Sequence, residues 1–301
     1  MSNNLCIFGE VLFDHLPDGR RVLGGAPFNV AWHLQAFGEH PLMISRVGND
    51  GEGDEVKAAM QRWGLDPDGL QTDNDLPTGK VQITIEQGEP NYDIVYPAAW
   101  DAIEPAIQPQ NCRLLYHGSL ALRSERSRES WKELRSGAIE TVFVDVNLRP
   151  PWYGRDRVLQ ALTGAHWVKL NGNEMEQLAP GHGTKQQRAR AFIIKYGLDG
   201  LILTSGAEGA AVATASGEYL ETRPSRGIVV KDTVGAGDSL TAVMILGLMR
   251  EWPLQTTLDR AQSFASAIVQ SRGATVDDPA FYKKFLDAWS QDTFNASGND
   301  S

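Results

Sequence analysis

The sequence contains very few cysteines: Cys6 and Cys112 are the only two among 301 residues. They are far apart in the chain and Cys6 stands in an apolar run, so we expect buried free thiols rather than a disulfide. No apolar run approaches the roughly 18 residues that a membrane span needs. The start of the chain also has no basic segment followed by an apolar stretch, as a secretory signal would. We therefore expect a cytoplasmic protein.

Positive charge is scarce as well. Lys and Arg number 28 against 38 Asp and Glu, which gives a formal net charge of -10. No basic stripe is available to neutralise phosphates along a strand, so a nucleic-acid binder is excluded. The chain has no Gly-x-x-x-x-Gly-Lys-Ser/Thr loop, no Gly-x-Gly-x-x-Gly after its first apolar run, and no His-Glu-x-x-His. These absences argue against a P-loop enzyme, a dinucleotide oxidoreductase and a zinc protease.

What the sequence does have is a regular alternation of strand-like and helical segments. This alternation predicts an α/β fold with a mostly parallel sheet and helices on both of its faces. Ligands of such sheets bind at the carboxyl ends of the strands. The expected strands are Leu5–Val11, Leu42–Val47, Arg113–His117, Thr141–Val146, His166–Leu170 and Leu201–Thr204. The expected helices are Pro27–Phe37, Glu52–Trp63, Glu125–Arg135, Arg155–Leu162 and Gln186–Tyr196.

One segment breaks the alternation. Residues 80–86 are apolar at every second position, and residues 91–96 follow across a turn that contains Gly88. This pattern predicts a hairpin with one polar face. With residues 11–23 it could form a small sheet (strands roughly within 11–23 and 78–98) that covers a site, or it could be an ordinary edge hairpin. We expect a single domain over residues 1–289 and a disordered tail over 290–301.

The most informative segment is Asp232-Thr233-Val234-Gly235-Ala236-Gly237-Asp238-Ser239, which leads into a nearly all-apolar stretch, Leu240–Met249. An apolar helix of this kind must be buried. Small residues before a helix let the backbone approach an anion, which the unpaired N–H groups and the dipole of the first turn attract. Gly235, Ala236 and Gly237 are therefore candidates to hold the negative charge of a transferring phosphoryl group.

Asp238 stands beside this candidate anion site. A lone Asp at the start of a helix is usually a cap or a first-turn acid. An acceptor hydroxyl, however, needs a base that takes its proton as it attacks a phosphoryl group. A carboxylate within reach of both the hydroxyl and the anion site meets that need, so we favour Asp238 as a catalytic base.

Two further segments near the N-terminus contain candidate binding residues. Gly24-Gly25-Ala26-Pro27-Phe28-Asn29 places a proline where a helix begins and an amide in its first turn, where it can bind hydroxyls. Asp14 follows the first expected strand, where an acid is well placed to bind adjacent sugar hydroxyls. Each of these features is weak alone, because glycine-rich turns and loop acids are common.

Taken together, these segments resemble the PfkB/ribokinase family of carbohydrate kinases. Gly24-Gly25 through Asn29-Val30-Ala31 to Gly38 is similar to the N-terminal signature of the family, and residues 232–238 are similar to its C-terminal signature. The resemblance covers essentially the whole chain. It implies a ribokinase-like, doubly wound sheet with a small β-sheet lid, ATP as phosphoryl donor and Mg²⁺ as cofactor.

The resemblance also implies roles for individual residues. Asp238 would be the base, with Gly235, Ala236 and Gly237 as the anion hole. The sugar would be bound by Asp14, Gly24, Gly25 and Asn29. The nucleotide and its phosphates would be bound by Lys169, Asn171, Thr204, Gly206 and Gly209. Glu174, in an Asn-x-x-Glu element, would position Mg²⁺ through water, and Asp232 would contribute to a site for a monovalent cation such as K⁺.

Within the family the pattern is similar to the fructokinase branch, in the segments 9–14, 24–27 and 145–150. Arg149 would hold substrate or neutralise phosphate, although an exposed arginine after a strand is an equally ordinary interpretation. Relatives in the fructokinase and ketodeoxygluconate kinase branches usually have an Arg after the lid tyrosine, whereas Pro97 follows Tyr96 here. The missing cation argues against an acidic sugar, since a buried carboxylate needs a positive or hydrogen-bonding partner.

Fructose is the expected acceptor, with fructose 6-phosphate as the product. Ribose, ketodeoxygluconate, a nucleoside or a sugar phosphate is an alternative acceptor. A non-catalytic sugar-sensing protein of the same fold is a further alternative, although it would need neither Asp238 nor an anion hole. The resemblance also implies a homodimer formed through the lid.

Overall fold

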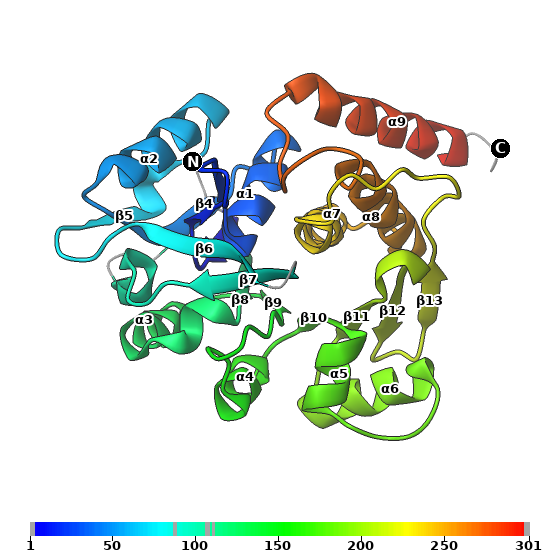
Figure 1. Cartoon of the computed structure of the whole chain (residues 1–301). Coiled ribbons are helices and arrows are strands. Elements are labelled where there is room, and N and C mark those ends of the chain that lie inside the picture. Colours follow the sequence, from blue (N-terminus) through cyan, green and yellow to red (C-terminus); the bar gives the residue numbers. More distant parts are fainter. Residues whose placement is uncertain (1–3, 87–88, 106–108, 110–111, 298–301) are drawn as a thin grey trace.

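The computed structural model describes residues 4–86, 89–105, 109 and 112–297. Two sheets organise these residues: a large sheet through the middle of the molecule and a small sheet beside it (Figure 1). Helices cover both faces of the large sheet. The doubly wound α/β architecture expected from the strand–helix alternation is therefore confirmed.

The large sheet has nine strands within the described residues, in the order β13-β12-β11-β10-β9-β8-β1-β4-β5. Neighbouring strands from β11 to β5 are parallel, whereas β12 and β13 extend the sheet as antiparallel strands. The strands are β1 (Leu5–Phe8), β4 (Leu42–Gly48), β5 (Leu70–Asp73), β8 (Leu114–Gly118), β9 (Thr141–Asp145), β10 (Trp167–Asn171), β11 (Gly200–Thr204), β12 (Ala210–Thr214) and β13 (Tyr219–Thr222).

Strand β1 illustrates why this sheet is buried on both faces. Leu5 and Ile7 belong to one apolar core and Cys6 and Phe8 belong to the other, and all four side chains are at most 1% exposed. Successive side chains of a strand point to opposite faces, so a strand covered on both sides must be apolar throughout. Cys6 and Cys112 are both free and buried, as expected.

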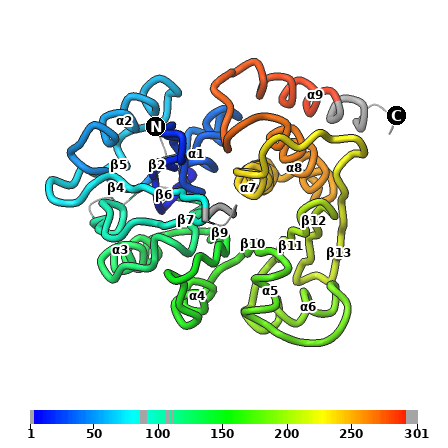
Figure 2. Tube along the Cα trace, viewed as in Figure 1, coloured from blue at the N-terminus to red at the C-terminus, as the bar shows by residue number. Residues whose placement is uncertain are grey.

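Two layers of helices enclose these cores (Figures 1 and 2). One core lies between the sheet and α1, α2, α7, α8 and α9, and the other lies between the sheet and α3, α4, α5 and α6. The helices are α1 (Ala26–Ala36), α2 (Gly51–Trp63), α3 (Glu125–Arg135), α4 (Arg155–Leu162), α5 (Gly172–Leu178), α6 (Lys185–Tyr196), α7 (Ala236–Met249), α8 (Leu254–Ile268) and α9 (Pro279–Ser297). Across the described residues, none of the helices is long and apolar enough to cross a membrane.

Most expected boundaries agree with the structure to within two residues, and two differ by more. The first expected strand, Leu5–Val11, is too long: β1 ends at Phe8, and the chain then enters the small sheet as β2 (Leu12–His15). The apolar run continues through this change because its later residues are buried beneath the small sheet. At the other end, α9 continues to Ser297, so residues 290–297 are helical rather than a disordered tail. No Gly or Pro interrupts residues 280–297, and residues 298–301 lie outside the described part.

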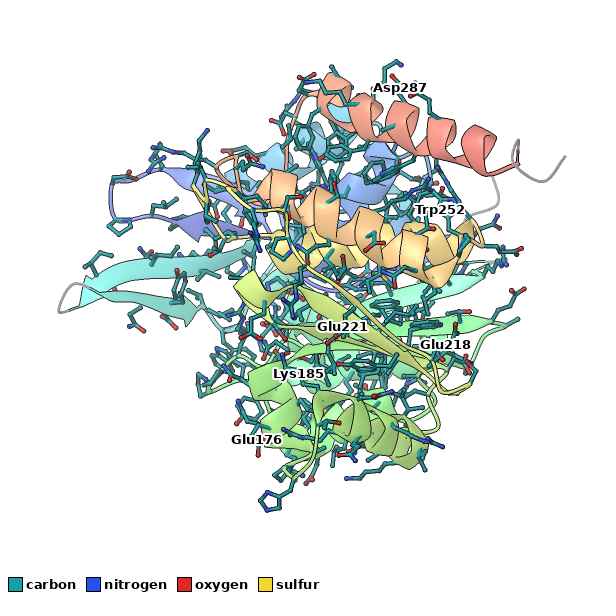
Figure 3. All side chains as sticks on the ribbon, turned by 90° about the vertical axis from the view of Figure 1, so that its right-hand side faces the viewer. Glu176, Lys185, Glu218, Glu221, Trp252 and Asp287 are labelled. Atoms are coloured by element: carbon teal, nitrogen blue, oxygen red, sulfur yellow. The ribbon has the colours of Figure 1, made fainter. Side chains whose placement is uncertain are left out.

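The small sheet consists of β2, β3 (Arg21–Gly24), β6 (Gly79–Glu86) and β7 (Glu89–Ile94), in the order β3-β2-β6-β7. It unites the two segments that the sequence analysis proposed to combine, and its strands project from the body of the molecule (Figure 3). The expected turn at Gly88 lies outside the described residues. We refer to these four strands as the lid.

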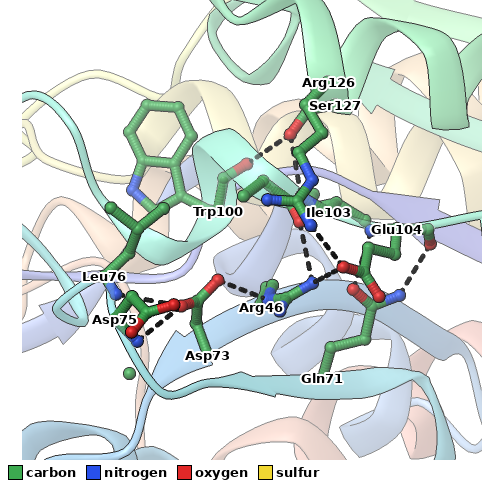
Figure 4. A network of polar contacts seen from close by, with 12 residues as sticks. Arg46, Gln71, Asp73, Asp75, Leu76, Trp100, Ile103, Glu104, Arg126 and Ser127 are labelled. Carbon is green, nitrogen blue, oxygen red and sulfur yellow. Dashed lines mark hydrogen bonds and ion pairs between the residues drawn. The ribbon is translucent and has the colours of Figure 1, made fainter.

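A largely enclosed arginine, with a side chain 11% exposed, attaches the base of the lid to the large sheet (Figure 4). Arg46 on β4 pairs with Asp73 at 2.9 Å and with Glu104 at 3.0 Å, and it donates a hydrogen bond to the carbonyl of Ala102. Gln71 and Glu104 exchange two further side-chain–backbone hydrogen bonds. Because Asp73 precedes β6 and Ala102 follows β7, the network fixes both ends of the β6–β7 hairpin.

A second arginine holds the end of β7. Arg123 has a side chain only 1% exposed, and it binds both carboxylate oxygens of Asp101 at 2.7 Å. It also donates to the carbonyls of Ile94 and Val95. Its guanidinium lies 4.0 Å from the ring centroid of Trp100, an arrangement that cation–π attraction favours. The hydrogen-bonding capacity of Arg123 is thus committed to the base of the lid.

We predict that Arg46→Ala lowers the free energy of unfolding by about 3 kcal/mol, because it leaves the Asp73 carboxylate buried without its counter-charge. Urea denaturation measures this loss. The control is Arg113→Ala, which removes an arginine that is 45% exposed and pairs only with exposed acids. That change should cost less than about 1 kcal/mol. Equal losses in the two variants would contradict a special contribution from the buried network.

Candidate active site

A cavity of about 450 Å³ opens at the carboxyl ends of β1, β9, β10 and β11. The strand order reverses beside β1, and such reversals are where open α/β sheets bind ligands. The lid forms one wall of the cavity through β2, β6 and β7, so it covers this site and is not merely an edge hairpin. The lid residues that line it are Leu12, Asp14, Val81, Tyr92 and Ile94.

Helix α7 begins at the opposite wall of the cavity. Its N-cap is Gly235, whose φ of 77° is left-handed, and a Cβ at this position would lie 2.5 Å from the Cα of Ala274. Only glycine fits that conformation and that space. Gly235 and Gly237 line the cavity, whereas Ala236 between them does not. The unpaired N–H groups and the positive end of the helix dipole are therefore available to an anion there.

Asp238 lies in the first turn of α7 and also lines the cavity. Its carboxylate accepts a hydrogen bond of 2.8 Å from the side-chain amide of Asn29 on α1. Burial raises the pKa of Asp238 to about 6, although the bond from Asn29 and the charge of Lys169 act in the opposite direction. A carboxyl with this pKa is largely ionised at neutral pH and is still a moderately strong base.

Lys169 is buried, although most lysines lie on the protein surface. It is 9% exposed, lies on β10, and its amine contacts both carboxylate oxygens of Asp145 on β9 at 2.8 and 2.9 Å. Thr241 of α7 donates to the same carboxylate at 3.0 Å. The three residues thereby join α7 to the sheet. A Cβ on Gly237 would lie 3.1 Å from the amine, so Lys169 lies directly against the start of α7.

The structure brings together most of the residues expected to bind the acceptor. A side chain at Gly24 would meet Asn29 Oδ1 at 3.7 Å and Asp14 Oδ2 at 4.0 Å, so these two groups face the same space. Asn29 Oδ1 has no hydrogen-bond partner among the described residues. Burial raises the pKa of Asp14, and the nearby charge of Arg149 offsets only part of that rise. Arg149 and Gly25 line the cavity as well, whereas Gly24 does not.

Asn171 and Glu174 form a capping box at the start of α5. The Glu174 carboxylate accepts one hydrogen bond from the backbone N–H of Asn171 at 2.8 Å and another from the N–H of Leu148 at 3.1 Å. Burial raises the pKa of Glu174. Both residues line the cavity. The segment is therefore a helix start that also reaches the candidate site.

The remaining candidates lie around this centre. Thr204 ends β11 and lines the cavity. Gly206 and Gly209 belong to the tight turn between β11 and the antiparallel β12, outside the cavity lining. Asp232 accepts hydrogen bonds of 3.0 Å from the backbone N–H groups of Val234 and Gly273, and so connects the two loops beside α7.

Metal ligands are limited in the described part of the chain, where no group of three or more His, Cys, Asp or Glu side chains could hold an ion. Lys169 neutralises Asp145, and backbone amides engage Glu174. Carboxylate oxygens keep further lone pairs, however, and Mg²⁺ usually binds through one or two carboxylates, waters and substrate phosphates. The residues present fit an ion held mainly in that indirect way.

Sequence reasoning missed three residues that shape this site. Glu10 was covered only as part of the segment 9–14 that resembles the fructokinase branch, yet it is 2% exposed and lines the cavity. Asp145 was noted only within a segment resembling the fructokinase branch, and its pairing with Lys169 requires the adjacency of β9 and β10. Arg123 stands in an apolar stretch before α3. The one signal in the sequence is that an arginine buried there would need an acidic partner.

Comparisons with known proteins agree with this geometry. The family model of the pfkB family carbohydrate kinases matches residues 6–280. The chain is 26% identical over 293 residues to the aminoimidazole riboside kinase of Salmonella typhimurium, covering 90% of this chain and 91% of the relative. It is 28% identical over 264 residues to a fructokinase of Klebsiella pneumoniae, covering 82% and 85% of the two chains.

Solved structures show the same fold. The fructokinase of Xylella fastidiosa with bound ATP matches with a TM-score of 0.82 and 20% identity, over 96% of this chain and 100% of that one. The aminoimidazole riboside kinase of Salmonella enterica, complexed with aminoimidazole riboside and an ATP analogue, matches with a TM-score of 0.79 and 25% identity. That match covers 94% of this chain and 99% of the other.

Proposed function

This chain belongs to the pfkB family of carbohydrate kinases, and we propose that it transfers the γ-phosphoryl group of ATP to fructose, giving fructose 6-phosphate. The observation that carries the proposal is the position of Asp238. Its carboxyl lies in a cavity beside the glycine-lined start of α7 and accepts a hydrogen bond from Asn29 of the neighbouring helix α1. A base and an anion site thus occur within one enclosed volume.

In the proposed reaction Asp238 is the base. The acceptor O–H bond breaks and its proton passes to the Asp238 carboxylate while the oxygen bonds to the γ-phosphorus. The bond from that phosphorus to the bridging oxygen breaks, and ADP leaves with the electron pair. Gly235, Ala236 and Gly237 would hold the charge that develops on the transferring oxygens. Little covalent chemistry is required of the protein, so positioning and electrostatic stabilisation dominate.

The nucleotide would lie along the carboxyl ends of β10 and β11. We assign Lys169, Asn171 and Thr204 to the phosphate side, because all three line the cavity. Gly206 and Gly209 would allow the nucleotide to approach the turn after β11 closely. Mg²⁺ would be positioned by Glu174 through water and would neutralise phosphate charge. A monovalent cation such as K⁺ would bind between the loops that Asp232 connects.

The acceptor would occupy the part of the cavity beneath the lid, held by Asp14, Asn29, Gly25 and Arg149, with Gly24 shaping its floor. Similarity to fructokinases supports fructose as the acceptor. Similarity to an aminoimidazole riboside kinase over 90% of the chain supports a riboside as a second candidate. Fructose in its furanose form and a riboside both present a primary hydroxyl on a five-membered ring.

We further propose a single functional domain over residues 1–289, at work in the cytoplasm, and a homodimer formed through the lid. Ile85 and Tyr92 on the lid strands are each 57% exposed, which leaves apolar surface for a second subunit to cover. A mass in solution of twice 33.0 kDa is expected. A monomeric mass at micromolar concentration would contradict the dimer.

A panel of acceptors with ATP consumption as readout tests the activity. We expect the highest kcat/KM with fructose, followed by ribosides, and we expect Asp238→Asn to lower kcat by about 10³-fold, since that is typical for loss of a general base. ATP and sugar binding should remain. Asp156→Asn, which changes an exposed first-turn acid of α4, is the matched control. Full activity in Asp238→Asn would refute the assigned role.

The same assignment predicts a pH dependence. Asp238 is active as a base only when it is ionised, so kcat/KM should fall as the pH drops below about 6. The hydrogen bond from Asn29 favours the ionised form, so Asn29→Ala should move this limb to higher pH. Asn49→Ala, which alters an exposed contact with Asn74, should leave the limb in place. An unchanged limb in Asn29→Ala would contradict Asp238 as the titrating group.

A further inference from the structure

Glu10 is a buried acid in a position that the proposed mechanism does not use. It occupies the short connection between β1 of the large sheet and β2 of the lid, and it is 2% exposed. Glutamate is almost never buried to this extent unless its carboxyl has a partner. Its side chain nevertheless lines the cavity, together with Asp14, Asn29 and Asp238.

The Glu10 carboxyl is incompletely satisfied within the protein. Its Oε2 atom has no hydrogen-bond partner among the residues that the structure describes. Burial and the nearby charge of Asp238 both raise the pKa of Glu10, which reaches about 7, so the environment penalises the bare carboxylate. A buried polar atom without a partner is costly unless something outside the protein supplies one.

The neighbouring cations do not explain the residue. Arg123 contributes to the electrostatics of Glu10, but both of its Asp101 contacts are 2.7 Å long and its remaining bonds go to the carbonyls of Ile94 and Val95. Arg149 lines the cavity without contacting Glu10 within ion-pair distance in the described structure. Glu10 is thus no counter-ion for a structural arginine.

The backbone of Glu10 has a separate role. A Cβ on Gly25 would lie 2.7 Å from the Glu10 carbonyl oxygen, so the main chain of residue 10 packs against the start of α1. That contact requires no particular side chain at position 10. The same packing holds residue 10 beside the helix that carries Asn29, whose Oδ1 is likewise without a partner in the described part of the chain. Two residues with an unsatisfied, buried acceptor oxygen therefore line one cavity.

We propose that Glu10 is a specificity-determining residue whose Oε2 atom accepts a hydrogen bond from a hydroxyl of the acceptor sugar, and that it thereby selects uncharged, polyhydroxylated acceptors. The inference rests on the proposed kinase function and adds the substrate class. Each of these two oxygens, Glu10 Oε2 and Asn29 Oδ1, can accept one hydrogen bond from a different sugar hydroxyl. A carboxylate or phosphate on the acceptor would meet Glu10, Asp14 and Asp238 in the same volume, opposed only by Arg149, because Asp145 already neutralises Lys169.

The test compares wild type with Glu10→Gln, which keeps the shape of the side chain and removes its charge. With fructose we expect KM to rise about tenfold, kcat to change less than KM, and KM for ATP to stay within twofold. Calorimetry with fructose and a non-hydrolysable ATP analogue should show the same tenfold loss of sugar affinity. Glu39→Gln is the control, because Glu39 pairs with Arg250 outside the cavity.

Monodeoxyfructoses, each lacking one hydroxyl, identify the bonded group. For one of them wild type and Glu10→Gln should have equal kcat/KM, because the contact is already absent. The ratio of kcat/KM for ketodeoxygluconate to that for fructose should increase about tenfold in Glu10→Gln. Glu10→Asp, which keeps the charge but shortens the reach, should raise KM for fructose without increasing that ratio.

Unchanged fructose affinity and unchanged selectivity in Glu10→Gln would overturn the proposal, as would a variant that loses only thermal stability. Should Glu10→Gln not fold, Glu10→Asp with the deoxy series decides, because equal fructose KM in that variant and wild type contradicts the contact. Failure of the proposed function looks different: wild type would bind fructose in calorimetry yet phosphorylate no acceptor. In that case the affinity comparison still decides whether Glu10 contacts the sugar.

Discussion

The hydrogen bond from Asn29 to Asp238 is the contact on which the site depends, since it joins residues 209 positions apart in the sequence. It brings the first turn of α1 against the first turn of α7. Further contacts fix the starts of both helices. Gly235 packs against Ala274, whose carbonyl is hydrogen-bonded to His33 of α1. Thr241 of α7 donates a hydrogen bond to Asp145. The acid, the amide and the glycine-lined helix start form a cavity only because these supports fix two separate segments in one arrangement.

The charges of the cavity follow from the same arrangement. Burial raises the pKa values of Glu10, Asp14, Glu174 and Asp238 together, because these acids share one poorly solvated volume. Lys169 and Arg149 are the cations among the lining residues, and Lys169 is paired with Asp145. A site of this kind is short of positive charge, which a metal ion entering together with the nucleotide would supply. An acidic enzyme can therefore bind a highly charged nucleotide, provided that the counter-charge arrives with it.

Much of the fold could be predicted from the sequence, because it depends on periodic patterns and on helix-start residues that act locally. The same is true of Asp238 and the glycines before it. Contacts across the chain could not be predicted: the pairing of Lys169 with Asp145 needs the strand order, and the enclosure of Arg123 needs the lid. The end of β1 was misplaced because burial under a second sheet keeps the sequence apolar. The importance of Glu10 was missed because the local sequence does not distinguish a buried glutamate from an exposed one.

The three-residue connection between β1 and β2 has a mechanical consequence. Strand β1 ends at Phe8 and β2 begins at Leu12, while β3 ends at Gly24 just before α1. The β2–β3 half of the lid therefore joins the body through two short connections, and Glu10 lies within the first. The β6–β7 half of the lid is held at its base by the ion pairs of Arg46 and Arg123. A tilt of the β2–β3 half would accordingly be absorbed near residues 9–11 and Gly25. Movement of the lid would then reorient the Glu10 carboxyl. Closure of the lid over a bound acceptor would thus be coupled to the group proposed to contact that acceptor.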